Sequence, residues 1–225
     1  MSNRRQLERI VPADGTQAYS MLLLLCGVAM LFAIPFASRV WQHSAFRSFF
    51  VPSMFFFAYT FLMSVLGMTR GSAIAREERR PRAALLIGYQ VLLGQLLVLP
   101  YLIYVRAVLK ASEPRIALVA LYACLVAYLA GLLGYSIETR ALRRQRSALF
   151  RKLGVVLAGY VLPFAVDFAL AGRAGILSLL SPIGAVLHIL ERGPALTTAF
   201  AFAMPTVVLV LFLLRICRHS QEASQ

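Results

Sequence analysis

The sequence predicts an all-α integral membrane protein with six transmembrane helices, cytosolic N- and C-termini, and a re-entrant or interfacial helical hairpin between helices 5 and 6. Three observations lead to this prediction. The 225 residues are 60% hydrophobic and 14% charged, which is more apolar side chain than one soluble core can hide. The apolar residues gather in six long runs, and successive connections alternate between rich and poor in Lys and Arg. We therefore expect one transmembrane domain, 1–225, with a cytosolic segment 1–18, a membrane part 19–216 and a cytosolic tail 217–225.

The six apolar runs are the predicted spans. Each has about 19 to 23 residues, and as a helix it would cover about 28 to 35 Å, enough for the hydrocarbon core with some tilt. Lipid offers no partner to exposed backbone groups, so each run is predicted to be helical. The runs are Tyr19–Ala37, Phe49–Thr69, Ala83–Val105, Ile116–Ile137, Leu153–Ala171 and Leu196–Ile216.

The basic residues predict the orientation. The N-terminus, the second and fourth connections and the C-terminus hold 16 Lys and Arg residues, Arg70 among them, against seven in the other connections. Because strongly basic connections stay in the cytosol, both termini are expected there. A basic rim beside anionic lipid headgroups then explains the net charge of +14, and no nucleic-acid partner is expected.

Motifs for cofactor chemistry are missing from the sequence. The three cysteines and three histidines stand singly, without a CxxC pair or a metal-ligand spacing. There is no GxxxxGK[ST], GxSxG or HExxH pattern. We therefore expect no cofactor or metal in this chain and no catalytic residues.

The stretch "REERRPR", residues 76–82, carries six charges in seven positions. At about 2.5 to 3.5 kcal/mol per charge, burying it at the bilayer centre would cost on the order of 15 kcal/mol, so it is expected to face the cytosol between the second and third spans. Alanines with charges of both signs favour a short surface helix, which Pro81 would stop or restart. This helix would suit docking of another protein; the alternative is a solvated loop that only follows the positive-inside rule.

A second informative segment lies between the fifth and sixth runs. Two apolar pieces, Gly175–Leu180 and Ile183–Leu190, are broken at Ser181 and Pro182. Each is too short to span the bilayer, and together they are too apolar for an open loop, so a hairpin dipping from the outer face is predicted. Pro182 is a natural first helical residue, with Ser181 as its cap.

Three features carry a resemblance to a known family: the six-span layout, "AREERRPRAALL" after span two, and "LLSPIGAVLHILERG" before the last span. In these features the chain resembles the permease subunits of type-2 ABC exporters, the ABC-2 transporter family. The resemblance covers nearly the whole chain. It implies that Ala75 to Arg82 is a coupling helix seated in a separate ATPase subunit, with contacts from Arg76, Glu77, Glu78, Arg79, Arg80 and Arg82. It also implies that the hairpin from Gly175 to Arg192, including Ser181, Pro182 and Glu191, closes the pathway on the outside.

The same resemblance implies the partners and the location. Two permeases, either two copies or this chain with a homologous permease, would pair with two ATPases that hold the ATP and Mg. The complex would be an exporter in the inner membrane of a bacterial-type cell, in contact with membrane lipid. Drug, lipid, peptide, polysaccharide-precursor and ion substrates are all compatible with the chain.

Candidate pathway residues come from the predicted spans. Asp167 is the only acid well inside a span, and with Tyr160 and Tyr59 it is a candidate to line the pathway; alternatively it is an outer-interface acid paired with Arg173. Small residues around Ala127 and Gly131 permit close helix approach, either within the chain or at a subunit interface.

Two other functions fit parts of the sequence. Glu77, Glu78 and Arg82 fit the EExxxR spacing, which resembles the glutamate pair of the CAAX-protease-like intramembrane peptidases. The other alternative is a noncatalytic membrane scaffold.

Overall fold

The computed structural model describes residues 17, 19–28, 45–76, 83–109, 112–143, 149–171, 181–190, 198–199, 201–203 and 205–211. These residues are almost all helical and contain no strand, which confirms the predicted all-α class. The labelled helices are α3 (Ala45–Arg76), α4 (Ala83–Leu109), α5 (Glu113–Arg143), α6 (Leu149–Tyr160), α7 (Leu162–Ala171) and α8 (Pro182–Leu190). A shorter apolar helix, Tyr19–Val28, precedes them, and residues 205–211 are helical near the C-terminal end.

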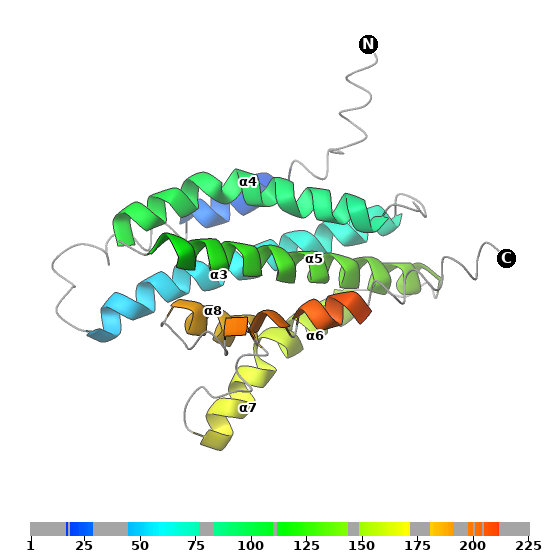
Figure 1. Cartoon of the computed structure of the whole chain (residues 1–225). Coiled ribbons are helices and arrows are strands. Elements are labelled where there is room, and N and C mark those ends of the chain that lie inside the picture. The colour runs from blue at the N-terminus through cyan, green and yellow to red at the C-terminus, as the bar shows by residue number, and fades with distance from the viewer. Residues whose placement is uncertain are drawn as a thin grey trace, which may run out of the picture.

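Three long helices form the body of the structure. α3, α4 and α5 run side by side, with α4 curved along the other two, and α6 and α8 lie on the opposite side of α5 from α4 (Figure 1). The end of α3, the start of α4 and the end of α5 lie together at one end of this bundle, called here the α3 C-terminal end (Figure 1). Pro100 lies inside α4, where it removes one helix hydrogen bond and favours the curvature.

Glycine determines how closely α3 and α5 approach. A Cβ added at Gly67 would lie 2.8 Å from the carbonyl carbon of Ala127, and one added at Gly71 would lie 2.7 Å from that of Gly131. Both distances are shorter than real Cβ contacts, so only glycine fits at these positions. Small residues four apart let helix backbones meet and gain dispersion and Cα–H···O contacts. The small-residue face around Ala127 and Gly131 therefore packs within the chain, against α3.

The fifth apolar run, which the sequence predicts to be a single helix over Leu153–Ala171, is broken into two helices. α6 ends at Tyr160, Val161 forms a turn, and α7 begins at Leu162. Pro163 causes this break because it has no N–H to donate to the carbonyl of Gly159 and its ring crowds that carbonyl. A new helix begins as the Ala165 N–H donates to the Val161 carbonyl at 2.8 Å, and α7 then points away from the bundle (Figure 1).

The second arm of the predicted hairpin is a helix packed into the bundle. Pro182 is the first residue of α8, as predicted, and the Ala185 N–H donates to the Ser181 carbonyl at 2.9 Å. Val186 is fully buried, because α8 packs against both α3 and α5. At its other end, Arg115 of α5 donates to the Leu190 carbonyl at 3.0 Å, which satisfies a terminal helix carbonyl with a cation. The first predicted arm, 175–180, lies outside the described residues.

The other predicted runs differ from the helices in their bounds. α3 is longer than the predicted Phe49–Thr69 at both ends, whereas α4 begins at Ala83 as predicted. Arg70 was assigned to the second connection, but it is a buried residue of α3, with only 3% of its surface exposed. Its Nε donates to Gln90 Oε1 at 2.7 Å, and the Tyr19 hydroxyl donates to the Gln90 carbonyl at 3.0 Å. These bonds join the first described helix, α3 and α4 inside the bundle.

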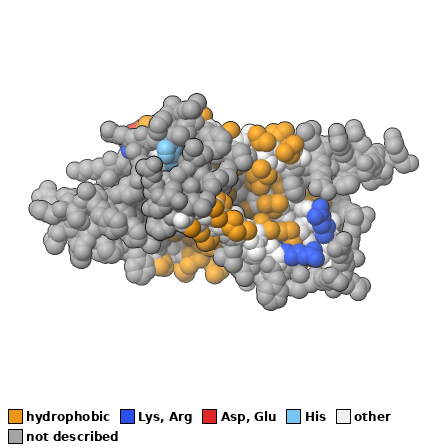
Figure 2. All heavy atoms as spheres, turned by 90° about the horizontal axis from the view of Figure 1, so that it is seen from below, with side chains coloured by type: hydrophobic (Ala, Val, Ile, Leu, Met, Phe, Trp, Pro, Cys, Tyr) orange, Lys and Arg blue, Asp and Glu red, His pale blue; other side chains and the backbone are white. Residues whose placement is uncertain are grey.

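Among the described residues, two helices are long and apolar enough to cross a membrane: α4 over Ala83–Tyr104 and α5 over Glu113–Leu142. The faces that the bundle leaves open are apolar as well. In a view from below, hydrophobic side chains occupy the centre of the surface and a group of Lys and Arg side chains lies toward the α3 C-terminal end (Figure 2). By length and composition, the described part of the chain is therefore compatible with a membrane.

Candidate functional site

A cluster of three charges joins α3, α5 and α6 at the α3 C-terminal end of the bundle. Arg76 Nε lies 2.7 Å from Glu138 Oε1, and Lys152 Nζ lies 2.5 Å from Glu138 Oε2. Each carboxylate oxygen of Glu138 thus accepts from one cation, and the cluster carries a net charge of +1. We call Arg76, Glu138 and Lys152 the charge cluster.

Burial differs strongly across the charge cluster. The Glu138 side chain is 5% exposed and that of Lys152 is 18% exposed, whereas Arg76 is 66% exposed. A buried carboxylate needs its partners, because removing them leaves an uncompensated charge in a medium of low dielectric constant. Glu138 is therefore the central anchor of the cluster, and Arg76 is its solvent-facing member.

Arg76 is also the first residue of the charged segment singled out in the sequence. It is the last residue of α3, so the helix runs directly into that segment. The remaining residues of the candidate coupling helix, Glu77, Glu78, Arg79, Arg80 and Arg82, lie outside the described residues. The structure therefore ties the first residue of the segment directly to α5, and through Glu138 to α6.

A second polar cluster lies where α6 ends. The Tyr160 hydroxyl is 2.5 Å from Ser64 Oγ and donates to the Thr60 carbonyl at 3.1 Å. Ser64 Oγ also lies 2.9 Å from that carbonyl. On the other side of the break, Ser181 Oγ donates to the Tyr160 carbonyl at 2.5 Å, so a carbonyl that no longer has a helix partner is satisfied.

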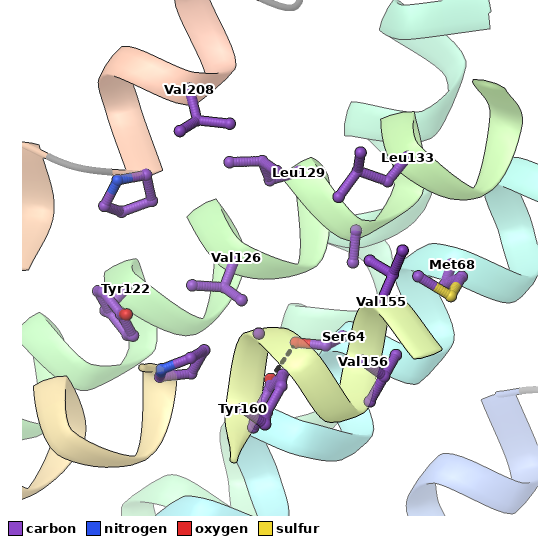
Figure 3. Close-up of a pocket in the computed structure, with 14 residues that line it drawn as sticks. Ser64, Met68, Tyr122, Val126, Leu129, Leu133, Val155, Val156, Tyr160 and Val208 are labelled. Carbon is purple, nitrogen blue, oxygen red and sulfur yellow. Dashed lines mark hydrogen bonds between the residues drawn. The ribbon is translucent and has the colours of Figure 1, made fainter. Parts of the chain in front are cut away.

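A pocket of about 340 Å³ opens beside this hydroxyl cluster. Its walls come from α3, α5, α6, the first residue of α8 and the C-terminal helical residues 205–211 (Figure 3). The hydroxyls of Ser64 and Tyr160 meet at its wall, opposite the apolar side chains of α5 such as Val126 and Leu129 (Figure 3). The pocket is a half-open apolar hollow with a small polar patch, the usual composition of a small-molecule site.

The predicted pathway residues are not all in one place. Tyr160 lines the pocket. Tyr59 is not among the pocket residues; it is buried in α3, with its hydroxyl hydrogen-bonded to Gln95 Oε1. Asp167 belongs to α7, and its side chain lies outside the described part of the structure. Pro182 lines the pocket and Ser181 is buried beside it, whereas Glu191 lies outside the described residues.

One short helix joins the charge cluster to the pocket. Lys152 lies in α6 one turn before Val155 and Val156, which line the pocket, and Tyr160 ends the same helix. At 1.5 Å per residue, the 12 residues of α6 extend about 18 Å. α6 is therefore held at one end by Glu138 and at the other by Ser64, Thr60 and Ser181.

Sequence reasoning missed Glu138, Lys152 and Ser64 as site residues. Glu138 directly follows the predicted fourth span and precedes a strongly basic connection, so its position as a lone acid there was the available signal. Ser64 stands in an apolar run four residues after Thr60, a spacing that places both on one helix face. Neither pattern indicates which distant helix supplies the partner.

Metal binding and family membership give no further assignment. Within the described ranges, no three His, Cys, Asp or Glu side chains come together to hold a metal ion. No protein-family model, curated protein or solved structure matches the chain.

Proposed function

We propose that this chain is the membrane-spanning permease subunit of an ATP-binding-cassette exporter, driven by a separate ATPase subunit that docks on residues 76–82. In this proposal the ATPase partner holds the ATP and Mg, and the chain itself has no catalytic role. A second permease, either another copy or a homologous chain, completes the pathway, and the complex lies in the inner membrane of a bacterial-type cell.

The exposed faces of the helices support the membrane part of the proposal. On α4, Leu85, Leu92, Leu96 and Ile103 are exposed at intervals that place them on one helix face, and Leu85 and Leu96 are 73% and 67% exposed. Covering each such side chain is worth about 1.5–3 kcal/mol. A row of this kind is unfavourable in water and favourable against acyl chains.

The arrangement of α6 supports the transport part. A partner that moves segment 76–82 would act on Arg76, and the Arg76–Glu138–Lys152 contacts would pass that force to α5 and α6. Because α6 ends at a break rather than continuing into α7, it can shift without carrying α7 along. Its far end borders the pocket, so a shift at the charge cluster would change the pocket wall.

The single observation that carries the proposal is the position of Arg76. It is both the end of α3 and the first residue of the charged segment, and it is bonded to the carboxylate that also holds α6. A plain membrane anchor would need only Lys and Arg at the lipid surface and would not need this buried carboxylate between three helices.

Purification from native membranes tests the proposal. A tagged chain extracted in mild detergent is expected to bring with it one nucleotide-binding subunit, identified by mass spectrometry, and the complex is expected to hydrolyse ATP. The double variant Arg79→Glu/Arg80→Glu should lower the recovery of that subunit by at least about tenfold, which corresponds to a loss of about 1.4 kcal/mol of binding.

Arg106→Gln is the matched control, because Arg106 is exposed and lies at the opposite end of the bundle, where it pairs with Glu113. This variant should retain the partner. Recovery of no ATPase with the wild-type chain, or equal recovery with both variants, would contradict the proposed docking.

A further inference from the structure

The pocket between α5 and α6 has the size of a small-molecule site. Its volume of about 340 Å³ is roughly twice that of an apolar protein cavity of about 150 Å³ that holds benzene. A ligand of about ten to fifteen heavy atoms would fill it. Because its walls all come from this chain, binding there needs neither a second permease nor an ATPase.

The walls of the pocket favour a neutral and largely apolar ligand. None of the 14 residues that line it is charged, and most of them are aliphatic. A charged group would lose its hydration without gaining an ion-pair partner among these residues. The pocket is thus suited to an alkyl or ring system.

The hydroxyl cluster sets the polar requirement. Ser64 and Tyr160 have one hydroxyl proton each, and both protons have acceptors inside the cluster: the Thr60 carbonyl accepts one, and the 2.5 Å contact between the hydroxyl oxygens uses the other. Neither hydroxyl then has a proton left for a ligand, and at least one of the two hydroxyl oxygens accepts no hydrogen bond inside the cluster. The cluster therefore accepts hydrogen bonds from a ligand better than it donates them.

We propose that this pocket binds a neutral amphipathic small molecule that has an apolar body and one hydrogen-bond donor, such as an alcohol, and that the donor bonds to the Ser64–Tyr160 hydroxyl pair. The ligand lies with its apolar part against Val126 and Leu129 of α5 and Val155 of α6. This binding does not depend on the proposed transport function.

Photolabelling of the purified chain in lipid nanodiscs tests the proposal. The probe is the diazirine analogue of 1-octanol, and the competitors are 1-octanol and its isomer methyl heptyl ether, which has the same atoms but no donor. Both are compared at equal concentrations in the lipid. Adducts are expected on the peptides that contain Val126 and Val155. Octanol should compete about three- to tenfold better than the ether, the ratio expected for one neutral hydrogen bond.

Three variants complete the test. Val126→Phe fills the pocket and should remove the competed labelling, whereas Leu121→Phe, on an exposed face of the same helix, should leave it unchanged. Ser64→Ala/Tyr160→Phe should remove the preference for octanol over the ether. If this double variant fails to fold, the comparison of octanol with the ether in the wild-type chain still decides.

Three results would overturn the proposal. The first is labelling spread evenly over the lipid-facing residues of α4. The second is equal competition by octanol and the ether in the wild-type chain. The third is that Val126→Phe behaves like Leu121→Phe.

Discussion

Replacing Gly67 by alanine tests the packing of α3 on α5. The new methyl group would lie 2.8 Å from the carbonyl carbon of Ala127 and closer still to its oxygen, whereas ordinary contacts begin at 3.4 Å. The helices must therefore separate by at least 0.6 Å at this point, because 3.4 minus 2.8 is 0.6. Both neighbours are backbone atoms of rigid helices, so no side chain can rotate to relieve the contact. Overpacking of this kind costs about 1–3 kcal/mol.

The expected cost can be measured as a shift in the apparent melting temperature of the detergent-solubilised chain. For a chain of this size, about 1 kcal/mol corresponds to about 2–4 °C, so Gly67→Ala should melt about 4–8 °C below the wild type if the cost is about 2 kcal/mol. Fluorescence-detected size-exclusion chromatography after heating gives this value without purification to homogeneity.

Gly154→Ala is the matched control. Gly154 lies in α6, and a Cβ added there meets nothing within 4 Å. Alanine stabilises a helix interior by about 0.5–1 kcal/mol relative to glycine, so this variant should melt about 1–4 °C above the wild type. If Gly67→Ala is as stable as Gly154→Ala, α3 and α5 do not meet at Gly67 and the described packing is wrong.

Two further substitutions test the two ends of α6. Glu138→Gln leaves Lys152 partly buried without its carboxylate, so this variant should be less stable by about 2 kcal/mol and melt about 4–8 °C lower. Arg140→Gln, on the exposed face of α5, should change the stability by less than about 0.5 kcal/mol. Equal melting temperatures of the two variants would refute the anchoring role of Glu138. Ser181→Ala removes the donor to the buried Tyr160 carbonyl and should cost about 1–3 kcal/mol; an unchanged melting temperature would show that this bond does not hold α8 to the end of α6.

The long helices were the predictable part of the fold. α4 and α5 correspond to apolar runs that are long enough to be helical whatever they pack against, and the predicted start of α4 at Ala83 agrees with the structure. The small residues around Ala127 and Gly131 correctly indicated close helix approach, since no other residues let two backbones meet. Local composition is enough to predict the helices and a face that permits close approach, whereas the partner helix is given by the tertiary structure.

Pro100 and Pro163, two of the five prolines inside the predicted spans, show where sequence reasoning reached its limit. Pro100 lies within a continuous α4, whereas Pro163 follows the break that ends α6. Both remove one helix hydrogen bond, so the local cost is similar. At the break, the Tyr160 carbonyl gains a partner from Ser181, which is 21 residues away. The difference thus depends on a tertiary contact that the local sequence does not contain.

The charge cluster was unpredictable for the same reason. Counting basic residues placed Arg76 in a connection that faces water. Such a count does not reveal that Arg76 pairs with Glu138, which is 62 residues away. Arg70 was counted in the same connection, although Gln90 holds it inside the bundle. A count of charges predicts the side of the membrane on which they lie, but it does not predict which of them form bonds between helices.

We propose that a separate ATPase contacts residues 76–82, and site-specific crosslinking in native membranes can detect this contact. A photoreactive amino acid is placed at Arg79, with the exposed Leu121 of α5 as the control position. We expect a crosslinked product between position 79 and one nucleotide-binding subunit, identified by mass spectrometry, and no such product from position 121. Absence of an ATPase product at position 79, or equal yields at both positions, would contradict it.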